Sequence, residues 1–321
     1  RNAQQILEDI FGYSEFRSGQ AEVIDHTING KDVLVLLPTG GGKSLCYQIP
    51  AMVRDGTGIV VSPLISLMQD QVEQLREAGV KAAYLNSSLD QDDYQATVQR
   101  LQEGHYDIIY VSPERLLQRY FLNMLAQTKI ALFAVDEAHC VSHWGHDFRP
   151  DYRRITRILQ SMPANLPVLA TTATANERVI SDIEAQLGKD MKTLRGSLMR
   201  DSLSLQTVPQ WSSAKRLAWL AKTLPALDGT GIVYAKTVRD CDTVSAWLQE
   251  NGIKAASYHG GKAGAEREKL ENELMGNQIK ALVATSALGM GFDKPDIGFV
   301  IHYQAPGNVI EYYQQVGRAG R

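Results

Sequence analysis

The chain has 321 residues, of which 44% are hydrophobic and 21% are charged, and its formal net charge is −3 at pH 7. This is a globular composition with room for two domains, no apolar run is long enough to cross a bilayer, and the charge excludes a general electrostatic attraction to nucleic acid. The three cysteines, Cys46, Cys140 and Cys241, lack paired spacing, so we expect free thiols in a reducing compartment, cytoplasmic (with the nucleoid in a bacterium) or nuclear.

Apolar runs alternate with helical patterns from the first residues onward. Six runs are typical of strands buried on both faces: 32–38, 58–63, 81–85, 107–112, 131–139 and 167–174. Between the second and third of them, the segment 66–79 places Met68, Val72 and Leu75 on one stripe and ends at Gly79. Because the next strand then needs a crossover connection, the pattern predicts a parallel sheet flanked by helices.

The same alternation restarts after residue 206. Further strands are predicted at 229–236, 254–259, 280–286 and 298–303, with helices at 238–252 and 265–277. The polar segment 196–213 is the best candidate for the junction. We therefore expect two α/β domains, 1–206 and 207–321, each a mainly parallel sheet flanked by helices, with a cleft between them.

The first predicted strand runs directly into PTGGGKS, residues 38–44. Glycines between a strand and a helix let backbone N–H groups converge on an anion, with Lys43 on the β- and γ-phosphates and Ser44 on Mg²⁺. The residues expected around the phosphates are Thr39, Gly40, Gly41, Gly42, Lys43 and Ser44. The strict phosphate-loop pattern has glycine where this chain has Leu37, and the alternative is an ordinary strand-to-helix turn.

Two adjacent carboxylates, Asp136 and Glu137, follow the fifth predicted strand. Because side chains alternate along a strand, we expect the two to point in different directions, so that one can hold Mg²⁺ through water and the other can orient the attacking water. Asp136 is the expected magnesium ligand, together with Ser44. Removing two carboxylates from water is costly, and Lys43 with Mg²⁺ would compensate for that cost. The alternative is that both acids are simple helix caps.

Near the end of the sequence printed above, Arg318 and Arg321 are three residues apart. On a helical turn both side chains would reach the same γ-phosphate and stabilise its transition-state charge. The alternative is a solvated basic segment.

The segment HCVSHWGHDFRP, residues 139–150, contains three of the seven histidines beside Cys140. Three interpretations are open from the residues alone. Cys140, His143 and His146 have the chemistry of zinc ligands, Trp144 and Phe148 suit a hydrophobic core, and an exposed aromatic loop would touch a ligand.

Several ordered motifs together resemble those of superfamily 2 helicases. They are PTGGGKS, DEAH at 136–139, ATTATA at 170–175, VATSALGMGFDKPD at 283–296 and QQVGRAGR at 314–321. The segments 11–24, 61–72 and 142–152 resemble the RecQ family of DNA helicases more narrowly. This resemblance covers essentially the whole chain and implies two tandem RecA-like domains.

The resemblance also implies roles for residues around a nucleotide. Arg17 and Gln20, with Tyr13 nearby, correspond to the family's adenine-recognition element, which makes ATP the expected cofactor together with Mg²⁺. His139 corresponds to the box residue that links hydrolysis to the second domain. Residues implied to contact the nucleotide from the second domain are Gly291, Asp293, Gln314, Arg318 and Arg321.

In the family, the segment after the acidic box is an aromatic-rich loop that contacts single-stranded DNA and couples it to ATP turnover. Aromatic faces stack on any base and arginine neutralises phosphate, so this interpretation displaces the zinc site. The loop residues are His143, Trp144, His146, Phe148 and Arg149. Further DNA contacts are expected along one sugar-phosphate strand from Ser62, Ser112, Arg115 and Thr285.

The expected function is therefore an ATP- and Mg²⁺-dependent helicase core with 3′ to 5′ polarity, whose partner is single-stranded and partly duplex DNA and not a membrane. The alternatives are an RNA-directed ATPase of the same superfamily and a nucleotide-gated scaffold. Ser202 stands where the family usually has asparagine after Arg200, which puts one interdomain contact in doubt. Many relatives continue into a zinc-binding and winged-helix region, so we expect strand separation by these residues to be weaker than their ATPase activity.

Overall fold

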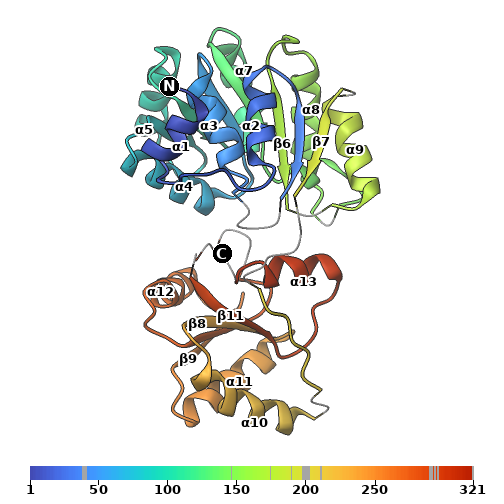
Figure 1. Ribbon diagram of the computed structural model, residues 1–321. Helices are drawn as coiled ribbons and strands as arrows, with labels where there is room; N and C mark the ends of the chain where they lie inside the picture. The colour runs from blue at the N-terminus through green and yellow to red at the C-terminus, as the bar shows by residue number, and fades with distance from the viewer. Residues whose placement is uncertain are drawn as a thin grey trace. The chain divides into compact units, whose positions relative to one another are not determined.

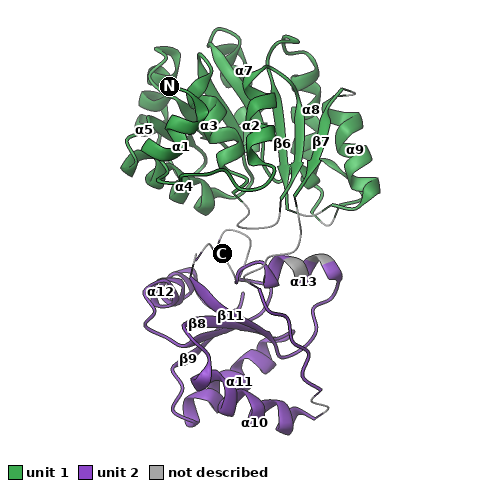
Figure 2. Cartoon of the chain, in the orientation of Figure 1, with its two compact units in different colours: residues 1–198 green, residues 199–321 purple. Residues whose placement is uncertain are grey.

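The structure is a computed structural model that describes residues 1–321 except 38–41, 146, 174, 189, 197–202, 210–211, 289–291, 293, 295 and 320–321, and the side chains of residues 310 and 313. The chain divides into two compact units, Arg1–Leu198 and Met199–Arg321 (Figure 2). The boundary expected between residues 206 and 207 stays a prediction.

The first unit is built on a seven-stranded sheet in the order β3-β4-β2-β5-β6-β1-β7, and its neighbouring strands pair in parallel (Figure 1). The strands are β1 (Val33–Leu36), β2 (Thr57–Val61), β3 (Ala82–Leu85), β4 (Ile108–Val111), β5 (Ile130–Val135), β6 (Val168–Thr172) and β7 (Lys192–Arg195). Each of the first six strands overlaps one of the six predicted runs. The edge strand β7 was not predicted, because its four residues are polar or only partly buried.

Helices cover both faces of this sheet. They are α1 (Ala3–Asp9), α2 (Gln20–Ile28), α3 (Leu45–Val53), α4 (Ile65–Glu77), α5 (Gln91–Gln102), α6 (Pro113–Leu116), α7 (Arg119–Leu125), α8 (Pro150–Gln160) and α9 (Glu177–Leu187), with the short 3₁₀ helix η1 (Ala138–Val141). Alternation along β1 sends Leu34 and Val35 to opposite faces. Leu34 packs in a core with α5, α7, α8 and α9, whereas Val35 packs in a core with α2, α3 and α4.

The second unit repeats this plan on a smaller scale. Its four-stranded parallel sheet has the order β11-β8-β10-β9. The strands are β8 (Thr230–Tyr234), β9 (Ala255–Tyr258), β10 (Ala281–Ala284) and β11 (Ile297–His302). The helices are α10 (Ser213–Thr223), α11 (Val238–Glu250), α12 (Gly264–Met275) and α13 (Val309–Val316), with the 3₁₀ helix η2 (Leu224–Ala226). Helices α10 and α11 pack on one face and α12 on the other, so the prediction of two helix-flanked parallel sheets is confirmed.

Parallel strands end at the same edge of a sheet, so the segments that follow them are neighbours in space. In the first unit, β1 leads toward Lys43, β2 toward Ser62, β4 toward Ser112, β5 toward Asp136, and β6 ends in the first two threonines of ATTATA, Thr171 and Thr172. The fold therefore gathers the candidate residues of this unit at one edge. In the part of the chain that the structure describes, no helix combines the length and apolar character needed to cross a membrane.

Candidate active site

The two box carboxylates lie just beyond the end of β5, which closes at Val135. The backbone N–H of Asp136 still donates to Val61 O (2.9 Å), but Glu137 has a left-handed backbone with φ of 53° and ψ of 46°. Strand alternation, from which the two side chains were expected to diverge, does not apply here. Both residues lie beyond β5, and the left-handed backbone of Glu137 turns the chain. Asp136 and Glu137 are 6% and 8% exposed, so both carboxylates are buried.

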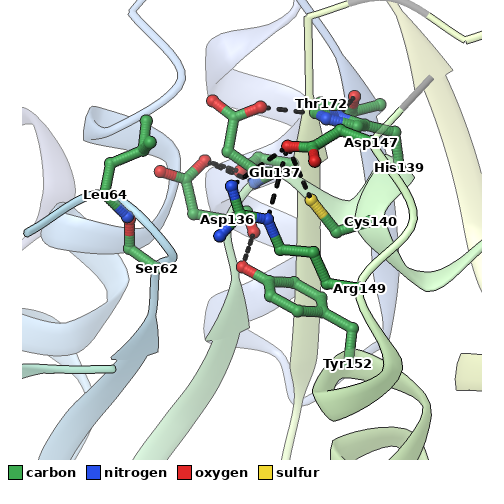
Figure 3. Close-up of polar contacts among 11 residues, drawn as sticks. Ser62, Leu64, Asp136, Glu137, His139, Cys140, Asp147, Arg149, Tyr152 and Thr172 are labelled. Atoms are coloured by element: carbon green, nitrogen blue, oxygen red, sulfur yellow. Dashed lines mark hydrogen bonds and ion pairs between the residues drawn. The ribbon is translucent and has the colours of Figure 1, made fainter. Parts of the chain in front are cut away.

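Three neighbours hold Asp136 in a fixed position. Its Oδ1 accepts hydrogen bonds from Thr171 Oγ1 (2.7 Å) and from the backbone N–H of Glu137 (3.0 Å). The hydroxyl of Tyr152, from α8, donates to the backbone carbonyl of Asp136 (2.8 Å; Figure 3). Neither Thr171 nor Tyr152 was singled out from the sequence, although Thr171 belongs to the ATTATA motif.

The pKa of the Asp136 carboxyl is subject to opposing effects. Burial raises the pKa of this carboxyl above its usual range, the neighbouring charge of Glu137 raises it further, and the ammonium of Lys43 lowers it. Lys43 therefore lies within electrostatic reach of the carboxylate. A buried acid with a displaced pKa beside a specific cation is the environment expected of a functional group.

The same residues fit a magnesium ion. The hydrogen bonds described for the Asp136 carboxylate all end on Oδ1, which leaves Oδ2 for a cation or its water shell. Ser44, at the start of α3, makes no capping hydrogen bond with its side chain. Carboxylate and hydroxyl oxygens are the ligands that suit Mg²⁺.

His139 is tied to the neighbouring strand. Its ring is 2% exposed, and Nδ1 lies 3.0 Å from Thr172 Oγ1 and 3.4 Å from Glu137 Oε2. Adjacent threonines of β6 thus support the box, Thr171 through Asp136 and Thr172 through His139. The sequence identified the motif but gave neither contact.

The N-terminal segment is joined to the phosphate loop through Gln20. This side chain is 1% exposed, its Oε1 accepts from the backbone N–H of Arg17 (2.8 Å), and its Nε2 donates to the carbonyl of Gly42 (3.1 Å). Gly42 has φ of 79°, and a Cβ there would collide with the Gln20 amide, so glycine is required at this position. Tyr13 is 51% exposed, and the role of these residues in adenine binding stays a prediction. Thr39, Gly40 and Gly41 lie outside the described residues.

The aromatic segment after the box is a surface loop. Trp144 is 56% exposed and therefore does not belong to the core, and the guanidinium carbon of Arg178, from α9, lies 3.2 Å from the centroid of its ring. The rings of His143 and Phe148 are stacked with centroids 3.8 Å apart. His146 lies outside the described residues. The loop thus presents one large aromatic side chain to solvent, backed by a cation.

The zinc ligands considered from the sequence, Cys140, His143 and His146, are not tested, because His146 lies outside the described residues. A different group of potential ligands is found among the described residues. The potential ligand atoms of His139, Cys140 and Asp147 lie within 4.8 Å of one another, but Arg149 donates to Asp147 Oδ2 through Nε (3.3 Å) and Nη2 (3.2 Å). Burial raises the pKa of the Cys140 thiol, and the charge of Asp147 raises it further. A cysteine binds zinc as a thiolate, so a thiol of raised pKa beside a carboxylate that is bonded to Arg149 does not favour the metal.

Comparison with known proteins decides the family. A model of the DEAD/DEAH box helicase family matches residues 17–183, and a model of the helicase conserved C-terminal domain matches residues 215–321. The chain is 38% identical over 328 residues to the ATP-dependent DNA helicase RecQ of Synechocystis sp., with 100% of this chain and 69% of that protein covered. The chain belongs to the RecQ family of DNA helicases.

Other RecQ proteins are longer than this chain. It is 41% identical to RecQ of Bacillus subtilis, covering 99% of the chain and 54% of that protein, and 40% identical to RecQ of Haemophilus influenzae, covering 99% and 51%. The chain therefore spans about half the length of these two relatives.

Solved helicases have the same fold. These are MrfA bound to DNA (TM-score 0.78, 20% identity, 100% of this chain and 49% of that one) and Dbp5 of S. cerevisiae bound to RNA and ADP BeF3 (0.74, 17%, 100% and 85%). At these identities they show the fold alone, and with the two family models they confirm the predicted tandem RecA-like architecture.

In the second unit of this RecQ-family chain, Arg318 is buried in a turn just after α13. Its Nη1 donates to the carbonyl of Phe292 (2.6 Å) and its Nη2 to the carbonyl of Leu288 (3.1 Å), so it holds the segment that follows β10. Gln314 is partly exposed, whereas the unpredicted Gln315 bonds His302 (2.8 Å). Gly291, Asp293 and Arg321 lie outside the described residues.

The other four residues expected to contact DNA differ in their surroundings. Ser62 and Ser112 follow the adjacent strands β2 and β4 but are only 2% and 3% exposed. The guanidinium of Arg115 lies 4.7 Å from the centroid of the Tyr94 ring, and Thr285 Oγ1 accepts from the backbone N–H of Ala287 (3.3 Å). The contacts of these four RecQ-family positions with DNA stay predictions.

Proposed function

We propose that this chain is the motor core of an ATP- and Mg²⁺-dependent DNA helicase, a DNA-dependent ATPase that moves 3′ to 5′ along single-stranded DNA and separates duplex DNA. Membership of the RecQ family supports the helicase activity, and the 3′ to 5′ polarity is what the resemblance to that family implies. The observation that carries the proposal is the buried Asp136 carboxylate, whose pKa is raised by burial and opposed by Lys43, at the sheet edge that also bears an exposed tryptophan loop.

The nucleotide is bound by residues that already have the required chemistry. Lys43 binds the β- and γ-phosphates, and Asp136 with Ser44 holds Mg²⁺. Bound Mg²⁺ would supply positive charge that stabilises the phosphate groups during transfer. Glu137, whose Oε2 lies 3.4 Å from His139 Nδ1, orients the attacking water. In the second unit, Gln314, Arg318 and Arg321 are the residues proposed to contact the γ-phosphate and sense its loss, and Arg318 would have to exchange its bonds to the carbonyls of Phe292 and Leu288 for that contact.

Coupling to DNA runs through the backbone that joins the box to the aromatic loop. A Cβ on Gly145 would lie 2.8 Å from the carbonyl of His139, and the backbone N–H of Arg149 donates to the carbonyl of Cys140 (2.9 Å). The loop is therefore packed tightly against η1. A base that stacks on Trp144 moves this loop, and packed elements transmit such shifts to Glu137 and His139. Single-stranded and partly duplex DNA is thus the proposed partner.

The test is steady ATP turnover with and without single-stranded DNA, for the wild type and Trp144→Ala. We expect strong stimulation in the wild type and loss of stimulation in the variant, with ATP binding retained. Tyr120→Ala is the matched control, because Tyr120 is also an exposed aromatic residue of this unit (63%). Stimulation that survives Trp144→Ala contradicts the sensor role. Equal stimulation by RNA would favour an RNA-directed ATPase, and absence of turnover would favour a scaffold.

A further inference from the structure

Trp144 and Arg178 come from separate segments and form one exposed pair. The Cζ atom of Arg178 lies 3.2 Å from the centroid of the Trp144 ring, yet the tryptophan remains 56% exposed and Arg178 is exposed as well. A stacked guanidinium covers one face of a flat ring, so the accessible area includes the opposite face. The pair is therefore a surface with one open aromatic face.

The charge of Arg178 is not neutralised within the described residues. No ion pair there joins it to an acid, whereas the nearby Arg153 and Arg195 are paired with Asp182 (3.0 Å) and Glu177 (2.7 Å). Stacking uses the flat face of a guanidinium and leaves its N–H donors at the edge. These donors match the oxygens of a phosphate.

We propose that Trp144 and Arg178 together form a binding platform for one nucleotide of a single strand. The base stacks on the open face of the indole, and Arg178 donates to an adjacent phosphate while its stacking holds the ring in place from behind. The inference rests on the proposed function and adds to it Arg178, a positioning residue of α9 that lies outside every motif considered above.

The platform is attached to the box on both sides. In the loop, the backbone N–H of Trp144 donates to Ser142 Oγ (3.2 Å). Below it, Arg153 of α8 bridges the carbonyl of Val141 (2.7 Å) and the carboxylate of Asp182 in α9 (3.0 Å). The helix that carries Arg178 and the 3₁₀ helix that carries His139 are thus joined through Arg153, so a shift of the platform reaches the box.

The size of the effect follows from what Arg178 contributes. An exposed cation–π stack is weak, so its loss together with one phosphate contact should weaken DNA binding about threefold to tenfold. The slope of log affinity against log salt should fall by about 0.7 for a single phosphate contact on a single strand. The two losses are separable, because the salt slope reports the phosphate alone.

The experiment is a double-mutant cycle on binding of a labelled oligodeoxythymidine, followed by fluorescence anisotropy. Arg178→Ala should raise Kd by about threefold to tenfold in the wild-type background, but by a smaller factor in Trp144→Ala, where the stacking is already absent and only the phosphate contact is lost. Arg178→Lys should recover the salt slope but only part of the affinity, since ammonium lacks the flat stacking face. Arg154→Ala, which removes another exposed arginine (69%), is the charge-matched control and should change Kd little.

An unchanged Kd in Arg178→Ala overturns the platform. An equal loss of affinity in the wild-type and Trp144→Ala backgrounds also overturns it, because Arg178 would then act only as a nonspecific charge. The assay is independent of turnover. If Trp144→Ala keeps full DNA stimulation of ATPase, the sensor proposal fails while the coupling between Trp144 and Arg178 in binding is still measured.

Discussion

Replacing Asp136 by asparagine should make the first unit more stable while it abolishes ATP turnover. The change removes a buried charge but keeps the Oδ1 atom that accepts from Thr171 and from the Glu137 backbone. Asp136 is 6% exposed, and burial followed by repulsion from Glu137 raises its pKa. Functional sites commonly hold such unfavourable groups at a cost in stability.

The sign follows from linkage between folding and protonation. A carboxyl whose folded pKa lies above its unfolded value of 3.8 favours the protonated form on folding, so its ionised form destabilises the fold at neutral pH. Substitution removes this penalty but also the attraction to Lys43, which offsets part of the gain. We expect a net stabilisation of about 0.5–2 kcal/mol. For a unit of this size, each kcal/mol raises Tm by roughly 2–4 °C.

The assay is thermal unfolding of the wild type and Asp136→Asn at pH 7.5, 6 and 5, with ATPase measured in parallel. The stability difference should shrink as the pH falls through the raised pKa of Asp136 toward 3.8. Thr171→Val is the control, because it removes the hydroxyl donor but keeps the charge, and it should destabilise by about 1–3 kcal/mol. An asparagine variant that is less stable at pH 7.5 would refute the reasoning, as would a difference that grows on acidification.

Three further changes test other contacts. Lys43→Ala should abolish ATP turnover in a steady-state assay and raise the pKa of Asp136 further, since Lys43 lowers it; retained turnover would contradict its role. Thr172→Val should destabilise by about 1 kcal/mol and reduce DNA stimulation, whereas Thr156→Val, which removes another buried hydroxyl, should affect stability alone. Gly42→Ala should destabilise by more than Gly104→Ala in denaturant titrations, because both have positive φ but only Gly42 faces a side chain.

The fold was predictable where apolar runs mark buried strands. Parallel strands covered on both faces are almost continuously hydrophobic, so the runs at 58–63 and 107–112 coincide with β2 and β4. The strand β7, Lys192–Arg195, lacks this signal because it lies at the sheet edge and carries charged residues. Its pairing with β1 is a tertiary effect that no local pattern contains.

The candidate site was predictable as a set of residues but not as a set of contacts. Glycine, lysine and paired carboxylates at strand ends indicate phosphate chemistry locally, so Lys43 and Asp136 were found. Thr171 and Tyr152 reach Asp136 only because the chain folds back, and short-range spacing cannot give that. Arg178 belongs to no motif, and only its position over Trp144 reveals it.

The central claim is that a single strand of DNA controls hydrolysis at the Lys43–Asp136 site. The most direct measurement is the ATPase rate of this chain with Mg²⁺, in the absence and presence of saturating single-stranded DNA. The account predicts a low rate without DNA and a rate many times higher with it. An equal rate in both conditions, with turnover intact, would contradict it.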